Sequence, residues 1–268
     1  MIGAICGDII GSIYERDNIK TTEFPLFDDD CRFTDDSVLT VALAEAILTG
    51  GSYETAMRGY FRRYPDAGYG SGFRAWARGE VSGPYRSCGN GAAMRISPVG
   101  WAFESLDTVL LKAGEYTAIT HNHPEGIKGA QATAAAIFLG RNGSSKDDIR
   151  RYIVQTFGYD LSGTCDGIRP SYRFDKTCQG SVPQAMTAFL ESSDYESAVR
   201  LAVSLGGDSD TLACITGGIA EAYYGGVPEW IAKKALGILD EPLRETTLRF
   251  IERYVQVRNG NPSLCLGA

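Results

Sequence analysis

The sequence of 268 residues has few of the side chains that bind soft metals or form covalent cross-links. It has two histidines, and its seven cysteines are scattered, odd in number and never spaced as a CxxC pair. Neither a structural zinc site nor a thioredoxin-type redox motif is therefore expected. Isolated thiols are typical of a reducing compartment, so we expect free cysteines and a cytoplasmic protein.

Long apolar runs and an excess of basic residues are also missing. Residues 1–8 include no basic segment, and Asp8 interrupts their apolar run, so we expect neither a signal peptide nor a membrane span. The formal net charge of −7 argues against a broad nucleic-acid-binding face, although it permits a local basic pocket. No stretch shows the alternation of apolar and polar residues that is typical of a half-buried strand.

Most of the chain instead shows helical periodicity. Helices are predicted at 2–14, 34–47, 53–63, 72–79, 107–120, 125–140, 145–157, 182–192, 194–205, 209–224 and 240–257, and from Pro228. The polar and aromatic segment from Tyr159 to Ser181 has no period, and loops of that length are often functional. We predict a compact, all-α single domain over residues 1–268, a bundle of roughly ten helices with an irregular tail at about 259–268.

The first predicted helix has glycines at every fourth position, Gly3, Gly7 and Gly11. They leave a smooth strip that another helix can approach closely. Each glycine costs about 1 kcal/mol relative to alanine in a helix, so packing or a ligand should compensate. Asp8 on this helix is expected to be a buried structural partner. Glu15 at its end is expected to be solvated, unless the helix leads into an acidic centre.

Two acidic segments offer only oxygen donor atoms: Thr34-Asp35-Asp36-Ser37 and Gly206-Gly207-Asp208-Ser209-Asp210-Thr211. Apolar residues follow each at helical spacing, so each is expected at a helix N-terminus. The absence of histidine and cysteine favours Mg²⁺ or Mn²⁺ over zinc. Four carboxylates exceed what one Mg²⁺ normally takes, which indicates two ions bridged by Asp210. The alternative is that these residues only cap their helices.

Gly89-Asn90-Gly91 is a third candidate segment, because N–H groups before a helix, with little side-chain bulk, suit a phosphate. The alternative is a plain turn. Arg95 could add charge there or form a surface pair. His121 and His123, next to a proline, are expected to hydrogen-bond a ligand hydroxyl or phosphate, or to make structural hydrogen bonds, and not to ligate metal.

Taken together, these motifs resemble the ADP-ribosylglycohydrolase family, which includes the dinitrogen-reductase-activating glycohydrolases and the ADP-ribosyl-acceptor hydrolases. The resemblance extends from Ile2 to about Tyr224. The matching residues are, in chain order, Gly7-Asp8, Gly11-Ser12, Glu15, Thr34 to Ser37, Gly89 to Arg95, His121 to Pro124 and Gly206 to Thr211. The resemblance implies an all-α fold with two Mg²⁺ or Mn²⁺ ions in a cleft.

The resemblance also implies a role for each matching residue. Thr34, Asp35 and Asp36 would hold one ion; Asp208, Asp210 and Thr211 would hold the other, with Asp210 shared. Glu15 matches the family's mobile glutamate. The segment around the phosphates and ribose is matched by Gly89, Asn90 and Gly91. Either His121 or His123 would contact the ligand, and Tyr172 or Phe174 would stack on adenine. The nucleophile would be a metal-bound water, with Glu15 or Asp36 as acid or base.

The expected reaction is hydrolysis of the bond between the anomeric carbon of ADP-ribose and an acceptor. The acceptor would be a protein, a small molecule or a nucleic-acid end, and the enzyme a monomer. Some branches of the family carry an acidic residue just before Gly-Asn-Gly, where this chain has Arg86-Ser87-Cys88. That departure leaves open whether arginine, serine, an O-acetyl ester or a nucleic-acid end is the acceptor. The alternatives are a metal-dependent phosphohydrolase acting on a nucleotide and a non-catalytic ADP-ribose-binding module.

Overall fold

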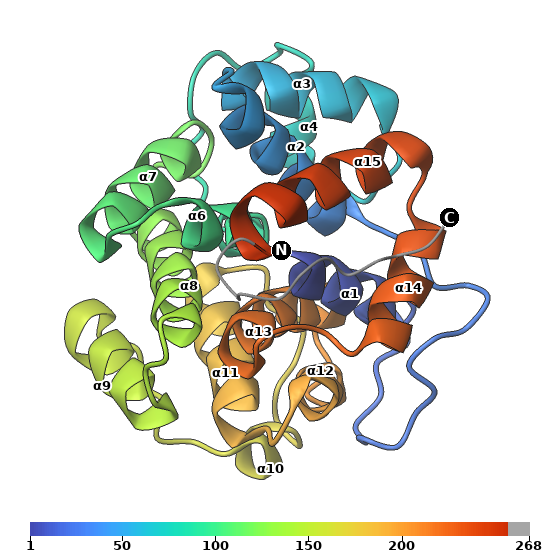
Figure 1. The fold of residues 1–268 in the computed structure, drawn as a ribbon, viewed down its shortest axis with the longest axis vertical. Helices are drawn as coiled ribbons and strands as arrows, with labels where there is room; N and C mark the ends of the chain where they lie inside the picture. The colour runs from blue at the N-terminus through green and yellow to red at the C-terminus, as the bar shows by residue number, and fades with distance from the viewer. Residues whose placement is uncertain (257–268) are drawn as a thin grey trace.

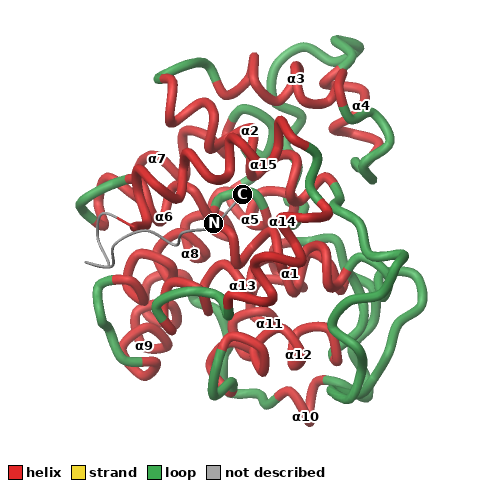
Figure 2. The backbone as a smooth tube through the Cα atoms, turned by 45° about the vertical axis from the view of Figure 1, so that its right-hand side comes forward, coloured by secondary structure: helices red, strands yellow, loops and turns green. Residues whose placement is uncertain are grey.

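The computed structural model describes residues 1–256, and this part of the chain is helical with no β-strand (Figures 1 and 2). An isolated antiparallel bridge pairs Gly89 with Thr177. The helices are α1 (Ile2–Gly11), α2 (Asp35–Thr49), α3 (Tyr53–Arg63), α4 (Ser71–Ala77), α5 (Gly91–Met94), α6 (Ser97–Ala102), α7 (Leu106–Ala118), α8 (Pro124–Arg141), α9 (Lys146–Phe157), α10 (Cys165–Ile168), α11 (Cys178–Glu191), α12 (Tyr195–Ser204), α13 (Ser209–Tyr224), α14 (Glu229–Ile238), α15 (Glu241–Phe250) and a π-helical turn (Ile251–Gln256). The predicted all-α fold is confirmed.

Helices α1 and α13 form the centre of the molecule, and the other long helices surround them (Figure 1). Every residue of α1 is buried, and α13 is buried from Ser209 to Ala222. Neither helix therefore has a polar outer face. They are adjacent in space although the sequence separates them by about two hundred residues, so tertiary packing alone unites their ends.

The glycine strip of α1 faces the backbone of α13, as its spacing predicts. A Cβ atom added to Gly7 would lie 2.0 Å from the carbonyl oxygen of Ala213, and one added to Gly11 would lie 2.5 Å from the Cα atom of Asp210. Both separations are shorter than any van der Waals contact. Gly3 meets Gly217 in the same way, at 2.4 Å from its carbonyl oxygen. The two backbones thus touch along the full length of α1.

Hydrogen bonds fix the register between the two helices at both ends. Glu221 on α13 is buried and accepts a hydrogen bond from the backbone N–H of Gly3 at 2.8 Å. The Tyr195 hydroxyl donates to the carbonyl of Gly3 at 2.8 Å. At the opposite end, the Ser209 hydroxyl donates to the carbonyl of Gly11 at 3.2 Å. The residues that follow α1 are therefore held beside the N-terminus of α13.

Several predicted boundaries are wrong, mostly where short helices begin or end. α1 ends at Gly11, so Glu15 lies in the turn that follows it. α10 lies inside the segment predicted as one long loop, and α11 begins at Cys178 because Thr177 caps it by accepting from the N–H of Gly180. The helices α5 and α6 were not predicted, since four and six residues are too few to show a period. The predicted tail at 259–268 lies outside the described residues.

No helix within residues 1–256 is both long and apolar enough to cross a membrane. This agrees with the absence of a long apolar run in the sequence.

Gly7→Ala should lower the free energy of unfolding by about 1–3 kcal/mol, because a methyl group has no space beside Ala213. The matched control is Gly59→Ala in the middle of α3, where an added Cβ atom meets nothing within 4 Å. That change should leave stability unchanged or raise it by up to about 1 kcal/mol. Urea denaturation of the three proteins measures both effects. Equal stability of the Gly7 variant and the parent would contradict direct backbone contact.

Candidate metal centre and active-site cleft

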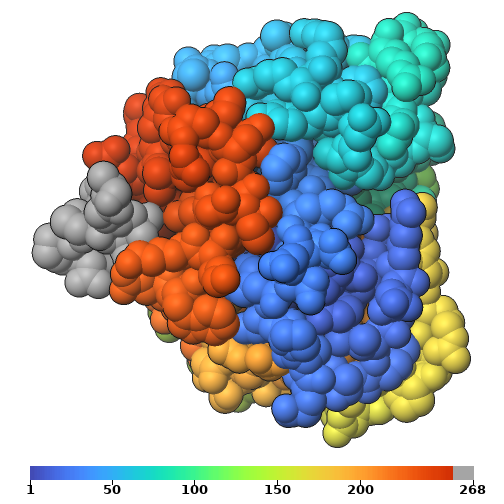
Figure 3. Space-filling view, turned by 90° about the vertical axis from the view of Figure 1, so that its right-hand side faces the viewer, coloured from blue at the N-terminus to red at the C-terminus, as the bar shows by residue number. Residues whose placement is uncertain are grey.

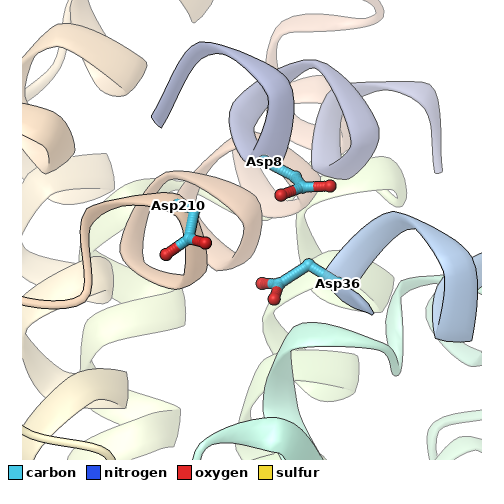
Figure 4. Close-up of side chains that lie close together, drawn as sticks. All are labelled: Asp8, Asp36 and Asp210. Carbon is cyan, nitrogen blue, oxygen red and sulfur yellow. The ribbon is translucent and has the colours of Figure 1, made fainter. Parts of the chain in front are cut away.

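Carboxylates from three helices converge where the N-termini of α2 and α13 meet α1. Asp8, Asp36 and Asp210 each point an oxygen into one shared space, with these oxygens within 4.8 Å of one another (Figure 4). A second group within the same limit comprises Glu15, Asp208 and Asp210. Asp210 therefore belongs to both groups. The two acidic segments, far apart in sequence, form a single buried centre.

Asp8 ties α1 to the start of α2. Its two carboxylate oxygens accept hydrogen bonds from the Thr34 hydroxyl at 2.6 Å, the Thr34 N–H at 3.0 Å and the Ser37 N–H at 3.1 Å, and from the Ser37 hydroxyl. The expectation of a buried structural partner is thus confirmed. Its place within the acidic centre was not predicted, because a lone aspartate in an apolar helix carries no signal of what faces it.

Asp36 is a buried carboxylate with almost no hydrogen-bond donors. Its Oδ1 atom has no hydrogen-bond partner. Its Oδ2 atom receives two long contacts of 3.4 Å, from the hydroxyl groups of Thr34 and Thr211. A buried carboxylate oxygen without a donor is costly, and a cation removes that cost. Together with the all-oxygen donor set, this orphaned atom fits a hard divalent ion such as Mg²⁺ or Mn²⁺.

Burial, together with mutual repulsion, raises the pKa values of these carboxyl groups. Burial, followed by the charges of Asp8 and Asp208, raises the pKa of Asp35 to about 8. Burial and the neighbouring carboxylates raise the pKa values of Asp36 and Asp210 well above their usual range. Without a cation, the centre therefore holds protons that exposed aspartates lose near pH 4.

Asp208 is positioned by the predicted phosphate-binding segment. The side-chain amide of Asn90 donates to Asp208 at 2.7 Å and to the Ser181 hydroxyl at 3.0 Å. The backbone N–H groups of Gly89 and Asn90 are also used internally, by Ser87 at 3.1 Å and by the carbonyl of Lys176 at 2.7 Å. The segment thus offers fewer free donors than its sequence indicated, and the Asn90 side chain orients a carboxylate of the centre.

The acidic centre forms the floor of a cleft of about 400 Å³. In the space-filling view, the surface of residues 17–33 (blue) lies between α3 and α4 (cyan) and the segment around 165–177 (yellow) (Figure 3). The lining includes residues around Arg32, the start of α4, and Phe174 and Lys176, whereas α3 contributes no lining residue. The predicted site residues that line the cleft are Glu15, Thr34, Asp35, Asp36, Gly89, Asn90, Gly91, His121, Asp208, Asp210 and Thr211.

Of the alternatives left open by the sequence, His123 and Tyr172 are not among the residues that line the cleft. The Nδ1 atom of His123 accepts from the N–H of Glu125 at 3.1 Å and so caps α8. Tyr172 packs against the backbone of Gly207 and donates its hydroxyl proton to the carbonyl of Gly180 at 2.9 Å. His121 and the exposed ring of Phe174 line the cleft in their place.

The backbone of Gly206-Gly207 explains why glycine precedes Asp208. Both residues have positive φ angles, of 69° and 75°, which other residues rarely adopt. The side-chain amide of Asn18 accepts from the N–H of Gly207 at 2.7 Å and donates to its carbonyl at 3.0 Å. It also donates to the carbonyl of Glu15 at 3.0 Å. Asn18 therefore joins the turn that carries Glu15 to the acidic loop.

Comparison with known proteins agrees with this arrangement. The model of the ADP-ribosylglycohydrolase family matches residues 1–263. The chain belongs to the ADP-ribosylglycohydrolase family. A solved structure described as "ADP-ribosylglycohydrolase-related protein complex" matches with a TM-score of 0.69 and 25% identity, covering 94% of this chain and 96% of that chain. The predicted fold type is thereby confirmed.

Of two named relatives, one has a name that states its acceptor and the other does not. "ADP-ribosylhydrolase ARH3" of Homo sapiens is 26% identical over 308 residues, covering 84% of each chain. "ADP-ribosylarginine hydrolase Tri1" of Pseudomonas putida (strain GB-1) is 26% identical over 275 residues, covering 88% of this chain and 73% of its own. Similarity of this degree shows the family without deciding which acceptor this chain uses.

The raised pKa values of the acidic centre lead us to expect that the stability of the protein depends on pH. Carboxyl groups whose pKa lies above the unfolded value stabilise the fold while they are protonated, so the metal-free protein should lose stability from about pH 4 to about pH 8. Mg²⁺ should raise the melting temperature more at pH 8 than at pH 5, and its binding should release protons. Thermal melts in chelator and in Mg²⁺ measure both effects. If the melting temperature of the metal-free protein rises from pH 4 to pH 8, the carboxyl groups of the acidic centre do not have raised pKa values.

Proposed function

We propose that this protein is a metal-dependent hydrolase that removes ADP-ribose from a modified acceptor by cleaving the bond at the anomeric carbon of the distal ribose. The observation that carries the proposal is the pair of acidic groups that share Asp210 on the floor of the cleft. Family membership and the activities in the names of ARH3 and Tri1 support it.

Two Mg²⁺ or Mn²⁺ ions would be held by side chains of α2 and α13. Thr34, Asp35 and Asp36 would hold one ion, and Asp208 and Thr211 the other, with Asp210 shared because it belongs to both acidic groups. When bound, the ions would supply Lewis-acid charge next to the distal ribose. Asp8 would keep Thr34 and the start of α2 in place, since its own oxygens already accept hydrogen bonds from this segment.

Glu15 is the better placed of the two candidate acid–base groups. Both residues line the cleft, but Glu15 is partly exposed in the turn after α1, whereas Asp36 is buried with its carboxylate turned into the acidic centre. Burial and the charge of Asp208 raise the pKa of Glu15, and a raised pKa favours a carboxyl group that can both hold and release a proton during the reaction. The remaining carboxylates would stabilise positive charge that develops on the ribose ring during cleavage.

The upper cleft would hold the rest of ADP-ribose. Gly89 and Gly91 leave room beside His121, and a phosphate or ribose fits where side chains are absent. Phe174 has a ring that is 45% exposed at the lining, so it can stack on adenine. Tyr172 would support the acidic loop from behind by its contact with Gly207.

Asp210→Asn should lower the rate of ADP-ribose release by about 100-fold or more, because it removes the charge common to both groups. Asp147→Asn is the matched control, since Asp147 also lies in the first turn of a helix but is exposed on α9. Chromatography of the products separates the alternatives. Free ADP-ribose supports the proposal, phosphate or AMP indicates a phosphohydrolase, and tight binding of ADP-ribose without turnover indicates a binding module.

The mouth of the cleft bears on the choice of acceptor. Arg16, Arg32 and Lys176 are exposed and line the cleft, and within residues 1–256 none of them forms an ion pair. Positive charge there disfavours a cationic guanidinium leaving group and favours a neutral or anionic one. We therefore propose that the acceptor is not arginine.

Serine-linked or phosphate-linked ADP-ribose should be hydrolysed with a higher kcat/KM than arginine-linked ADP-ribose. Arg32→Gln together with Lys176→Gln should narrow the difference, while Arg62→Gln, an exposed arginine on α3, should not. Steady-state assays of the three substrates at low salt measure the preference. Faster cleavage of the arginine-linked substrate by the parent protein would overturn the acceptor proposal but leave the hydrolase proposal intact.

A further inference from the structure

Arg95 is a buried cation without a carboxylate partner. It is 1% exposed, lines the cleft and, in the described part of the chain, forms no ion pair. Its Nη1 atom is buried with no hydrogen-bond partner. The alternative that Arg95 makes a surface pair is thus wrong. A buried charge is costly when nothing compensates it, so the neighbours of Arg95 should show what it contributes.

The hydrogen-bonding neighbours of Arg95 are Thr120 and the ring of His121, and the guanidinium carbon also lies 5.8 Å from the centroid of the Tyr53 ring. Its Nη2 atom donates to the Thr120 hydroxyl at 2.6 Å and lies 3.3 Å from the Nδ1 atom of His121. Thr120 in turn lies 2.8 Å from the same Nδ1 atom. A guanidinium group can only donate, so the contact with Arg95 requires Nδ1 to be an acceptor. The Thr120 oxygen accepts from Arg95, so its own proton can be donated to the same Nδ1 atom.

The other ring nitrogen of His121 faces the glycine segment of the cleft. A Cβ atom added to Gly91 would lie 3.2 Å from Nε2, and one added to Gly89 would lie 3.6 Å from it. The absence of these side chains leaves Nε2 accessible from the cleft. In a neutral imidazole whose Nδ1 accepts, Nε2 carries the proton. His121 thus presents an N–H group to whatever lies beside Gly89-Asn90-Gly91.

The charged or titratable groups that face the ring are Arg95 and Tyr85, whose ring centroid lies 5.8 Å from that of His121. Burial, followed by the positive charge of Arg95, lowers the pKa of His121 well below its usual range. Burial raises the pKa of Tyr85, so its phenol is neutral at physiological pH. The imidazole is therefore neutral as well, and it can donate but not act as a cation.

We propose that Arg95 is a positioning residue that fixes His121 as the neutral Nε2–H tautomer, so that the ring is a permanent hydrogen-bond donor to an oxygen of the ligand beside Gly89-Asn90-Gly91. The identity of that ligand as ADP-ribose rests on the proposed function, whereas the tautomer does not. An ammonium or guanidinium group would be rejected at this point, and a phosphate or hydroxyl oxygen accepted.

The tautomer can be measured directly, because the chain has only two histidines. Protein with ¹⁵N-labelled histidine gives one pair of ring signals for each, and His123→Gln assigns them. His121 should show a protonated Nε2 and an unprotonated Nδ1, unchanged from about pH 5 to about pH 8. An Nδ1–H tautomer, or titration of His121 near pH 6.5, would overturn the proposal whether or not the protein is a hydrolase.

Substitutions at Arg95 test its role in Mg²⁺-saturated protein. Arg95→Met should raise the pKa of His121 toward its usual range, since only burial then lowers it, and should populate both tautomers. Affinity for ADP-ribose should then fall by about 2- to 10-fold at pH 8, as for the loss of one hydrogen bond, and recover toward pH 5, where imidazolium donates from Nε2 again. Arg95→Lys keeps the charge and should keep His121 neutral. Thr120→Val removes the hydroxyl group from Nδ1 but keeps the charge of Arg95. His121 should therefore remain the Nε2–H tautomer in this variant.

The control is Arg62→Met, an exposed arginine on α3 that should change neither the histidine signals nor the affinity. Calorimetry with ADP-ribose gives the affinities, and thermal melts establish that each variant is folded. If Arg95→Met leaves both the tautomer and the pH dependence of binding as in the parent protein, Arg95 does not position His121. If that variant does not fold, the spectra of the parent protein and of Thr120→Val decide the question.

Discussion

The structure depends on the direct contact between the backbones of α1 and α13. Three glycines allow it, because any side chain at Gly3, Gly7 or Gly11 would occupy the space of a carbonyl group or Cα atom on α13. The contact places Asp8 and the turn with Glu15 beside Asp208 and Asp210. Packing and function are therefore joined: the helix pair at the centre of the core is also the frame of the acidic centre.

The acidic centre illustrates a balance between stability and function. Burial raises the pKa values of its carboxyl groups, and the unpartnered oxygen of Asp36 has no donor in the protein itself. A protein selected only for stability would avoid such a group. The surrounding structure compensates in part, since Asp8 accepts from Thr34 and Ser37 while Asn90 donates to Asp208. The carboxylate oxygens that these hydrogen bonds leave without a donor are suited to binding divalent cations.

The cleft combines three electrostatic environments within a small volume. Its floor is anionic, its wall contains the buried guanidinium of Arg95 beside a neutral histidine, and its mouth carries exposed cations such as Arg32 and Lys176. A ligand with hydroxyl groups at one end and phosphates further along would match the floor and the wall in turn. This local pattern cannot be read from the net charge of −7, because a sum of charges does not say where the charged residues lie.

The sequence by itself determined the helical class, the long helices, the two oxygen-rich segments and the close approach of another helix to α1. These features are local: periodicity, capping residues and glycine spacing act within a few turns. Only the tertiary structure decided that α13 is the partner of α1 and that Asp8 joins the acidic centre. It also decided that His121 and Phe174 line the cleft instead of His123 and Tyr172, and that Arg95 is buried. The reason is physical, since the direction and surroundings of a side chain depend on segments that are distant in sequence and meet only when the core is packed.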